Sequence, residues 1–143
     1  MNQDERVDAE KGSVKLNVTD SMRYALAETI CSQNRSRAQF IPNVQFGDPV
    51  WDLMLHLYTA EYFERSTTIA SISARTETQS SVTIRCLNYL LEQEAVFENT
   101  NQFSKKTMPY LVSDETKATI GSWLDNCISN LQTGLSNAAF NAH

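Results

Sequence analysis

The chain has 143 residues, 41% hydrophobic and 20% charged, which is the composition of an ordinary globular protein and enough for one domain with a hydrophobic core. Its net charge of −5 argues against indiscriminate binding to polyanions, because neutralised phosphates supply most non-specific affinity for DNA. No apolar run is long enough to span a bilayer, and the N-terminus lacks the apolar core of a signal peptide. We therefore expect a cytoplasmic protein that does not enter a membrane.

Residues that would carry catalysis or bind a metal are scarce. Cys31, Cys86 and Cys127 are widely spaced and form no CxxC pair, so neither a disulfide framework nor a zinc site is indicated. His56 stands alone in an apolar helical pattern, where packing is a far more common role than metal binding. No glycine-rich phosphate loop or nucleophile–base arrangement is visible. We expect no metal, no cofactor and no enzymatic activity.

The N-terminal part of the chain is polar. Residues 1–20 mix charges without sustained periodicity, which predicts a mobile arm. From Ser21 to about Phe40 the pattern predicts a helix capped by Asp20 or Ser21, with a thin apolar face and several arginines. Such a helix suits packing against a second subunit or a place near DNA, and a solvated surface helix explains the pattern about equally well.

A more strongly apolar helix begins near Pro49. Asp48 can cap it, and Pro49 suits the first helical position because its missing N–H would have no partner there. A broad apolar stripe follows at helical spacing, made of Trp51, Leu55, Tyr58 and Tyr62. We expect this helix to be the core helix of the domain.

Two shorter helical patterns follow and predict a helix-turn-helix. Hydroxyl residues up to Thr68 can cap a helix near 69–76, a turn falls at Glu77 and Thr78, and a second helix spans about 79–93. The inward face of the second helix is predicted to hold Thr83, Cys86, Leu87 and Leu90. The outward residues proposed to face DNA are Gln79, Ser80, Ser81, Ile84, Arg85 and Asn88. These side chains are mostly small or hydrogen-bonding, and Arg85 can contact a guanine bidentately.

A hairpin and a last helix complete the pattern. Short strands at 95–97 and 108–112 flank a polar loop containing Lys105 and Lys106, which together predict a wing over about 97–112. Pro109 restricts the returning strand to an edge. Ser113 or Asp114 then caps a helix with apolar residues at helical steps, namely Ile120, Trp123, Leu124, Cys127, Ile128 and Leu131. Residues 132–143 are expected to form a C-terminal tail, so the domain spans 21–131.

The phrases FGDPVWDLML, TTIASISARTETQSSVTIRCLNYLLEQEAV and LVSDETKA resemble the MarR-type winged-helix transcriptional regulators of bacteria, over about Met22 to Leu131. The resemblance implies a mainly α fold with a small β-hairpin wing, in which flanking N- and C-terminal helices form a homodimer. It also implies a pseudo-palindromic double-stranded operator, with the second helix of the motif in the major groove and the wing on the backbone or minor groove. The family's reading positions fall on Gln79, Ser80, Ser81, Ile84 and Arg85, and its basic wing pair falls on Lys105 and Lys106.

The sequence departs from the family pattern at several positions. Glu77 and Glu94 stand where the family has glycines, although glycine is preferred wherever φ is positive. Lys105 and Lys106 replace arginines, which keeps the charge but loses the planar fork suited to narrow minor grooves. The two glutamates leave the local backbone geometry open, and the two lysines predict a wing of reduced affinity.

Two further hypotheses stay open at the level of sequence. One is a winged-helix module that docks a protein through its aromatic residues, among them Tyr89, Phe97, Phe103 and Tyr110. The other is regulation by a small-molecule effector or by a thiol, for which Cys86 is the candidate, although buried cysteines are usually inert. We predict sequence-specific DNA binding by a homodimeric transcriptional regulator, with the protein-docking module as the alternative.

Overall fold

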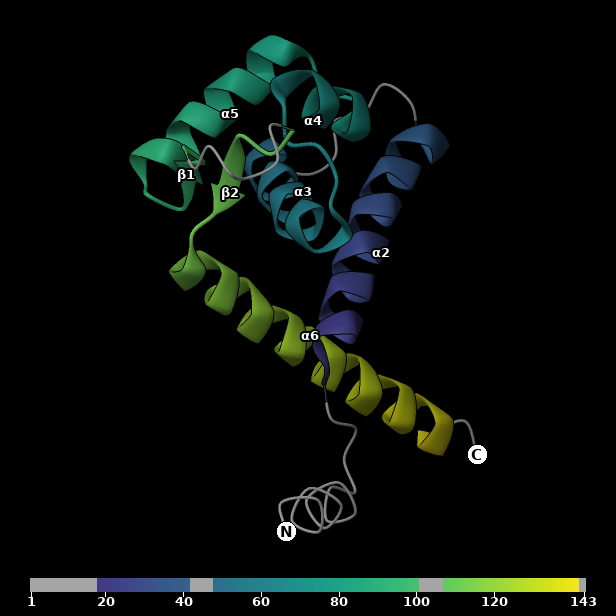
Figure 1. The fold of residues 1–143 in the computed structure, drawn as a ribbon. Helices are drawn as coiled ribbons and strands as arrows, with labels where there is room; N and C mark the ends of the chain where they lie inside the picture. Colours follow the sequence, from purple (N-terminus) through teal and green to yellow (C-terminus); the bar gives the residue numbers. More distant parts are fainter. Residues whose placement is uncertain (1–17, 42–47, 101–106, 142–143) are drawn as a thin grey trace, which may run out of the picture.

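The computed structural model describes residues 18–41, 48–100 and 107–141. In this part of the chain five helices and two strands follow one another (Figure 1), in the order α2 (Asp20–Phe40), α3 (Pro49–Phe63), α4 (Ile69–Thr76), α5 (Ser80–Glu92), β1 (Val96–Glu98), β2 (Tyr110–Val112) and α6 (Asp114–Asn141). The fold is mainly helical with one small antiparallel hairpin, as the sequence predicts.

Helix α3 forms the centre of the domain, as expected. Asp48 caps it, because its Oδ1 accepts hydrogen bonds from the backbone N–H groups of Val50 at 2.9 Å and Trp51 at 3.4 Å, and Pro49 occupies the first helical position. Its buried residues are Leu53, Leu55, His56, Leu57, Tyr58, Thr59 and Ala60. Helices α2, α4 and α5 and strand β2 all pack around it.

Helices α4 and α5 form the helix-turn-helix. Thr68 caps α4 by accepting a hydrogen bond from the backbone N–H of Ser71 at 3.2 Å. The predicted bounds of α4 are confirmed, and α5 is one residue shorter at each end than predicted, because Gln79 and Gln93 are its flanking cap residues. The two helices are joined inside the core by a 2.8 Å hydrogen bond from the Ser73 hydroxyl to Thr83 Oγ1.

The hairpin β1–β2 has a definite register, with Val96 opposite Val112, Phe97 opposite Leu111 and Glu98 opposite Tyr110. Strand β1 lies one residue later than predicted, and β2 starts only after Pro109, which has no N–H to contribute to a ladder. The Pro109 carbonyl still accepts a 2.7 Å hydrogen bond from the Asn99 N–H. A helix-turn-helix followed directly by this hairpin is the architecture of a winged helix.

The two ends of the helical region differ from the prediction. Helix α2 is capped by Thr19, whose Oγ1 accepts from the Met22 N–H at 3.4 Å, so neither Asp20 nor Ser21 is the cap and the predicted arm ends earlier. Helix α6 continues to Asn141, so most of the predicted tail at 132–143 is helical. Gly134 lies within this part of the helix without ending it.

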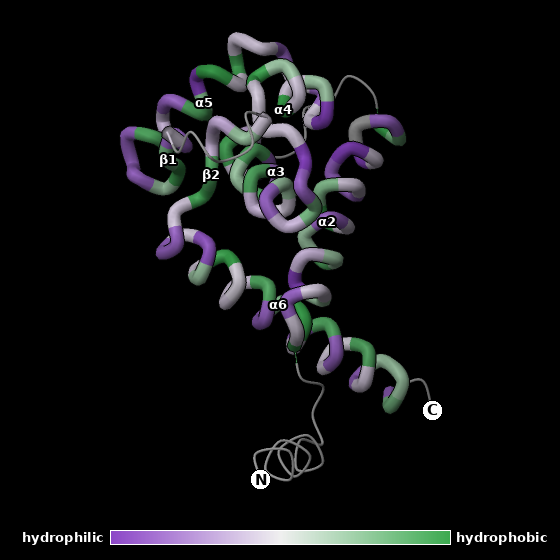
Figure 2. Tube along the Cα trace, in the orientation of Figure 1, coloured by the Kyte–Doolittle hydropathy of each residue, from purple (hydrophilic) through white to green (hydrophobic). Residues whose placement is uncertain are grey.

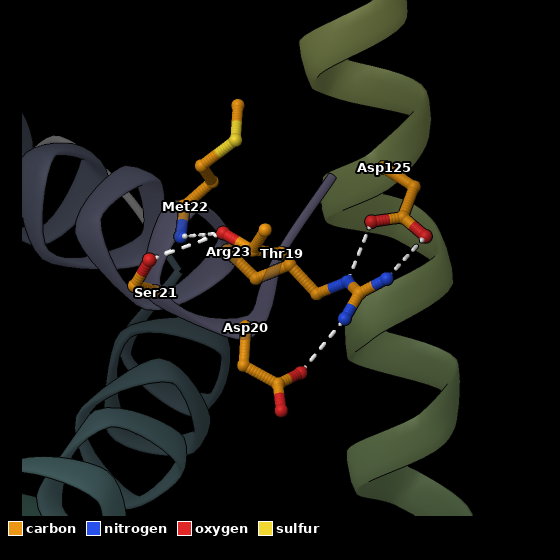
Figure 3. A network of polar contacts seen from close by, with 6 residues as sticks. All are labelled: Thr19, Asp20, Ser21, Met22, Arg23 and Asp125. Carbon is orange, nitrogen blue, oxygen red and sulfur yellow. Dashed lines mark hydrogen bonds and ion pairs between the residues drawn. The ribbon is translucent and has the colours of Figure 1, made fainter. Parts of the chain in front are cut away.

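Helix α2 packs within its own domain. Ala27 and Cys31 are buried against the core, and the ring of Tyr24 stacks on that of Tyr58 in α3 with centroids 4.5 Å apart. At its N-terminal end, Arg23 reaches α6 (Figure 3), where its Nε and Nη2 donate to Asp125 Oδ1 and Oδ2 at 2.6 and 3.2 Å. The thin apolar face predicted from sequence is therefore supplemented by a bidentate ion pair.

Helix α6 extends away from the rest of the domain (Figure 1), with its C-terminal half projecting beyond α2. Figure 2 shows that hydrophobic residues recur along α6 up to its C-terminal end. None of the described helices combines the length and the apolar character that crossing a membrane requires.

Candidate nucleic-acid interface

Helix α5 has two contrasting faces. Its inward face is confirmed: Thr83, Cys86, Leu87 and Leu90 are buried. The predicted contact residues are all exposed on the helix or at its N-terminal cap, namely Gln79, Ser80, Ser81, Ile84, Arg85 and Asn88. The wing lysines Lys105 and Lys106 lie outside the described residues. The structure therefore brings the predicted reading residues together on one accessible surface.

The exposed face of α5 can present hydrogen-bonding groups to another molecule. Glutamine and asparagine carry both donors and acceptors, and the serine hydroxyls serve as either. Arg85 adds a planar donor fork, and it makes no hydrogen bond or ion pair with the residues that the structure describes. A helix with such a surface has the chemistry needed to contact base edges in a major groove.

The angle between α4 and α5 is held by buried polar contacts and by the turn. Ser73 and Thr83 are both buried, so their mutual hydrogen bond is shielded from water. Thr83 was expected to face inward, whereas Ser73 was not identified from the sequence, because a single serine has no periodic signal. Ser73 does lie four residues, about one helical turn, after Ile69, but this single spacing is too weak to predict burial of a serine.

Two glutamates adopt left-handed backbone conformations that favour glycine, with φ of 55° at Glu77 and 60° at Glu94. Glu77 ends α4, and Glu94 lies in the turn between α5 and β1. The chain therefore retains the turn geometry that favours glycine, although a side chain there is strained.

Basic residues behind α4 are used inside the protein. Arg35 of α2 donates from Nη1 to the carbonyl oxygen of Arg75 at 3.2 Å, which ties α2 to the C-terminal end of α4. Arg65 pairs with Glu28, and this guanidinium lowers the pKa of the Glu28 carboxyl. Arg35 thus has a structural role within the domain. Its presence in α2 needs no contact with DNA as an explanation.

Burial shifts the pKa values of His56 and the cysteines away from their ordinary values. Burial, followed by the charges of Arg75 and Arg35, lowers the pKa of His56 to about 4, so the imidazole is neutral at pH 7. Burial raises the pKa of the Cys31 thiol to about 12 and also raises that of Cys86. The described residues contain no group of three or more side chains that could hold a metal ion.

A hollow between α3 and α6 has a volume of about 440 Å³, and Trp51, Met54, Ile120 and Trp123 line much of it. The two indole rings meet edge to face with centroids 4.9 Å apart. The small-molecule effector considered from the sequence stays a prediction, since nothing in this hollow specifies a ligand.

Comparisons with known proteins give one similarity in structure. No family model matches the sequence, and no curated protein matches it. The chain is similar to a solved structure described as S. aureus MepR bound to ethidium bromide, with a TM-score of 0.49, 8% sequence identity, and coverage of 87% of this chain and 91% of that chain. At this level the likeness assigns neither a family nor a function, and the surface of α5 remains the feature on which function is argued.

Proposed function

We propose that this protein is a homodimeric transcriptional regulator that binds double-stranded DNA in a sequence-specific manner. The observation that carries the proposal is the division of α5 into a buried apolar face and an exposed hydrogen-bonding face. The first helical turn of α5 is exposed, just after the connection at Glu77. Residues 79–93 therefore suit the role of a recognition helix that enters the major groove. The hairpin, over 97–112, would then lie on the backbone or in the minor groove.

Each residue predicted to contact DNA has a role in this proposal. Arg85 donates two hydrogen bonds to a guanine, while Gln79 and Asn88 contact bases or phosphates with their amides. Ser80 and Ser81 allow close approach, and Ile84 makes apolar contact with a thymine methyl group. Lys105 and Lys106 would contact phosphates from the wing, which fixes position without reading sequence.

The balance of charge favours selective over general binding to DNA. The exposed face of α5 offers Arg85 but also Glu92, and the whole chain has a net charge of −5. Because non-specific affinity comes mainly from neutralised phosphates, we expect weak attraction to arbitrary DNA. Affinity for an operator would depend on correct base contacts made by two subunits.

The second subunit is argued from α6. Its buried residues Ile120 and Leu124 are followed by Ile128, Leu131, Leu135 and Ala138 at alternating steps of four and three residues, the spacing of a coiled-coil seam. Leu131 is 55% exposed and Leu135 is 70% exposed in the single chain. A second copy of the projecting half of α6 would bury this stripe and place two recognition helices on one DNA duplex.

Substitution of Arg85 tests the proposed reading contact. Arg85→Ala should reduce discrimination at one base pair of each half-site by about 1–3 kcal/mol, because a bidentate contact is lost. The measurement is a competition mobility-shift titration against single-base variants of a bound site. Glu92→Ala, on the same exposed face, is the matched control and should raise affinity for all sequences alike. Unchanged discrimination in Arg85→Ala would show that Arg85 does not read a base.

A protein-docking module is the second candidate function. Tyr89 on α5 and Phe97 on β1 are large aromatic side chains that remain substantially exposed, and aromatic residues are enriched at protein interfaces. Phe103 lies outside the described residues. A DNA-binding assay at low ionic strength, where attraction to phosphates is strongest, distinguishes the two candidate functions. If the protein binds no DNA fragment even there, the docking function is favoured over the regulator.

A further inference from the structure

Thr67 lies in the short connection between α3 and α4 and is completely buried, with 0% of its surface exposed. It makes two hydrogen bonds to the segment that leads into β2. Its backbone N–H donates to the Thr107 carbonyl at 2.7 Å, and its Oγ1 accepts from the Tyr110 N–H at 3.2 Å. A residue in the linker is therefore bonded to the loop end of the hairpin, more than forty positions away.

The geometry of the hairpin explains why Tyr110 needs an acceptor outside it. The Asn99 N–H bonds to the Pro109 carbonyl, so the pair Glu98–Tyr110 occupies a non-hydrogen-bonded position of the antiparallel ladder. The N–H of Tyr110 consequently points away from β1. The hydroxyl of Thr67 satisfies this donor at the open edge of β2, where it would otherwise remain unpaired in a partly buried place.

The same connection also holds the start of α4. Thr68, the next residue, is the N-cap of α4 and accepts from the Ser71 N–H. Adjacent residues thus hold the loop end of the hairpin and the first turn of the helix-turn-helix. A displacement of one is transmitted to the other over a single peptide bond.

We infer that Thr67 is a positioning residue that sets the hairpin against the helix-turn-helix, so that both meet DNA in one fixed arrangement. This inference rests on the proposed DNA-binding function. Thr67 itself is buried and does not touch the DNA. Its contribution is to keep the spacing between the hairpin and α5 constant, which reduces the ordering cost of binding.

The test compares three substitutions of buried threonines in the full-length protein. Thr67→Val is nearly isosteric and removes only the acceptor for Tyr110, whereas Thr67→Ser keeps a hydroxyl. Thr59→Val is the matched control, because Thr59 is also fully buried but its hydroxyl bonds to the Leu55 and His56 carbonyls within its own helix.

Amide hydrogen exchange, followed residue by residue, reports on the hairpin without DNA. The Tyr110 amide should exchange about fivefold faster or more in Thr67→Val, relative to Leu111, whose N–H faces β1. In Thr67→Ser and Thr59→Val the ratio should stay that of the wild type. An unchanged Tyr110 ratio in Thr67→Val would overturn the inference.

Binding to a DNA site selected by the wild-type protein gives the functional measurement. Thr67→Val should raise the dissociation constant several-fold while the order of preference among single-base variants stays the same, because α5 is unaltered. Equal losses of affinity in Thr67→Val and Thr59→Val would reduce the role of Thr67 to general stability and contradict the inference. If the wild type binds no DNA, the proposed function fails, and an accelerated Tyr110 exchange would still show that Thr67 positions the hairpin.

Discussion

His56 connects core packing to a pH dependence of stability. The imidazole is 4% exposed and its Nδ1 has no hydrogen-bond partner among the described residues. Its pKa is lowered from 6.5 to about 4 in the folded protein, so the unfolded chain takes up the proton first as the pH falls. The free energy of unfolding should therefore decrease between about pH 6.5 and pH 4, by up to about 3 kcal/mol.

Urea denaturation at several pH values checks this expectation. His56→Leu, which removes the titrating group, should show a much smaller decrease between pH 6.5 and pH 4.5 than the wild type. Glu28, whose pKa is lowered, loses its stabilising charge at still lower pH and does so in both proteins. If the free energy of unfolding falls equally in the two proteins between pH 6.5 and pH 4.5, His56 does not cause the pH dependence.

The left-handed glutamates give a second prediction for single residues. Glu77→Gly and Glu94→Gly should each raise the free energy of unfolding by about 0.5–1 kcal/mol, because the strain of an L side chain is relieved by more than glycine loses in entropy. Arg85→Gly, at an exposed position in the interior of helix α5, is the control and should lower the free energy of unfolding by about 0.5–1 kcal/mol. Thermal or urea denaturation measures all three. A loss of stability at positions 77 and 94 would contradict the claim that these turns are strained.

Only some of the residues that matter for the backbone and for buried hydrogen bonds could be picked out from the sequence. Glu77 and Glu94 were singled out because they stand where the family that the sequence resembles has glycines, but their left-handed backbone was established only by the structure. Thr67 and Ser73 were missed as structural residues. Their burial depends on partners at Tyr110 and Thr83 that are distant in the sequence or in another helix, and a lone hydroxyl residue leaves no periodic trace.

At the scale of elements, helices with strong apolar periodicity were predicted most accurately. The stripe of α3 and the two faces of α5 follow from the 3.6-residue repeat, and the caps Asp48 and Thr68 mark where helices begin. Errors occurred where the apolar signal is weak. Helix α2 gains stability from ion pairs as well as apolar packing. Helix α6 continues past Leu131 through residues that are all exposed in the single chain.

The projecting half of α6 yields a prediction about assembly. Leu131→Asp and Leu135→Asp should convert a dimer into a folded monomer, because each buries a charge in the proposed seam. Ser136→Asp is the control, since this exposed residue lies on another side of the helix and should leave the dimer intact.

Light scattering coupled to size-exclusion chromatography gives the mass, and circular dichroism confirms that the variants remain helical. A wild-type protein that is monomeric at micromolar concentration would contradict the proposed role of α6. A dimer that persists in both leucine variants would place the interface elsewhere on the molecule.

In the whole molecule, the proposed DNA binding combines features of one helix, of the domain and of the dimer. In the proposed regulator, the exposed face of α5 would contact the bases and its contacts with α4 and the hairpin would orient it. A second copy of the chain would bring a second α5 to the same duplex. Specificity would then come from a small set of base contacts that each of the two subunits makes. The net charge of −5 gives the protein little general attraction to DNA.

The most direct test of the central claim is selection of bound fragments from a random pool of double-stranded DNA at moderate salt, followed by sequencing. A dimeric regulator should enrich a pseudo-palindromic motif whose half-sites are centred about 10 base pairs, or one helical turn, apart. The reason is that a symmetric dimer presents two copies of α5 to successive major grooves. Sequences retained without any shared motif, or no retained DNA at all, would contradict it.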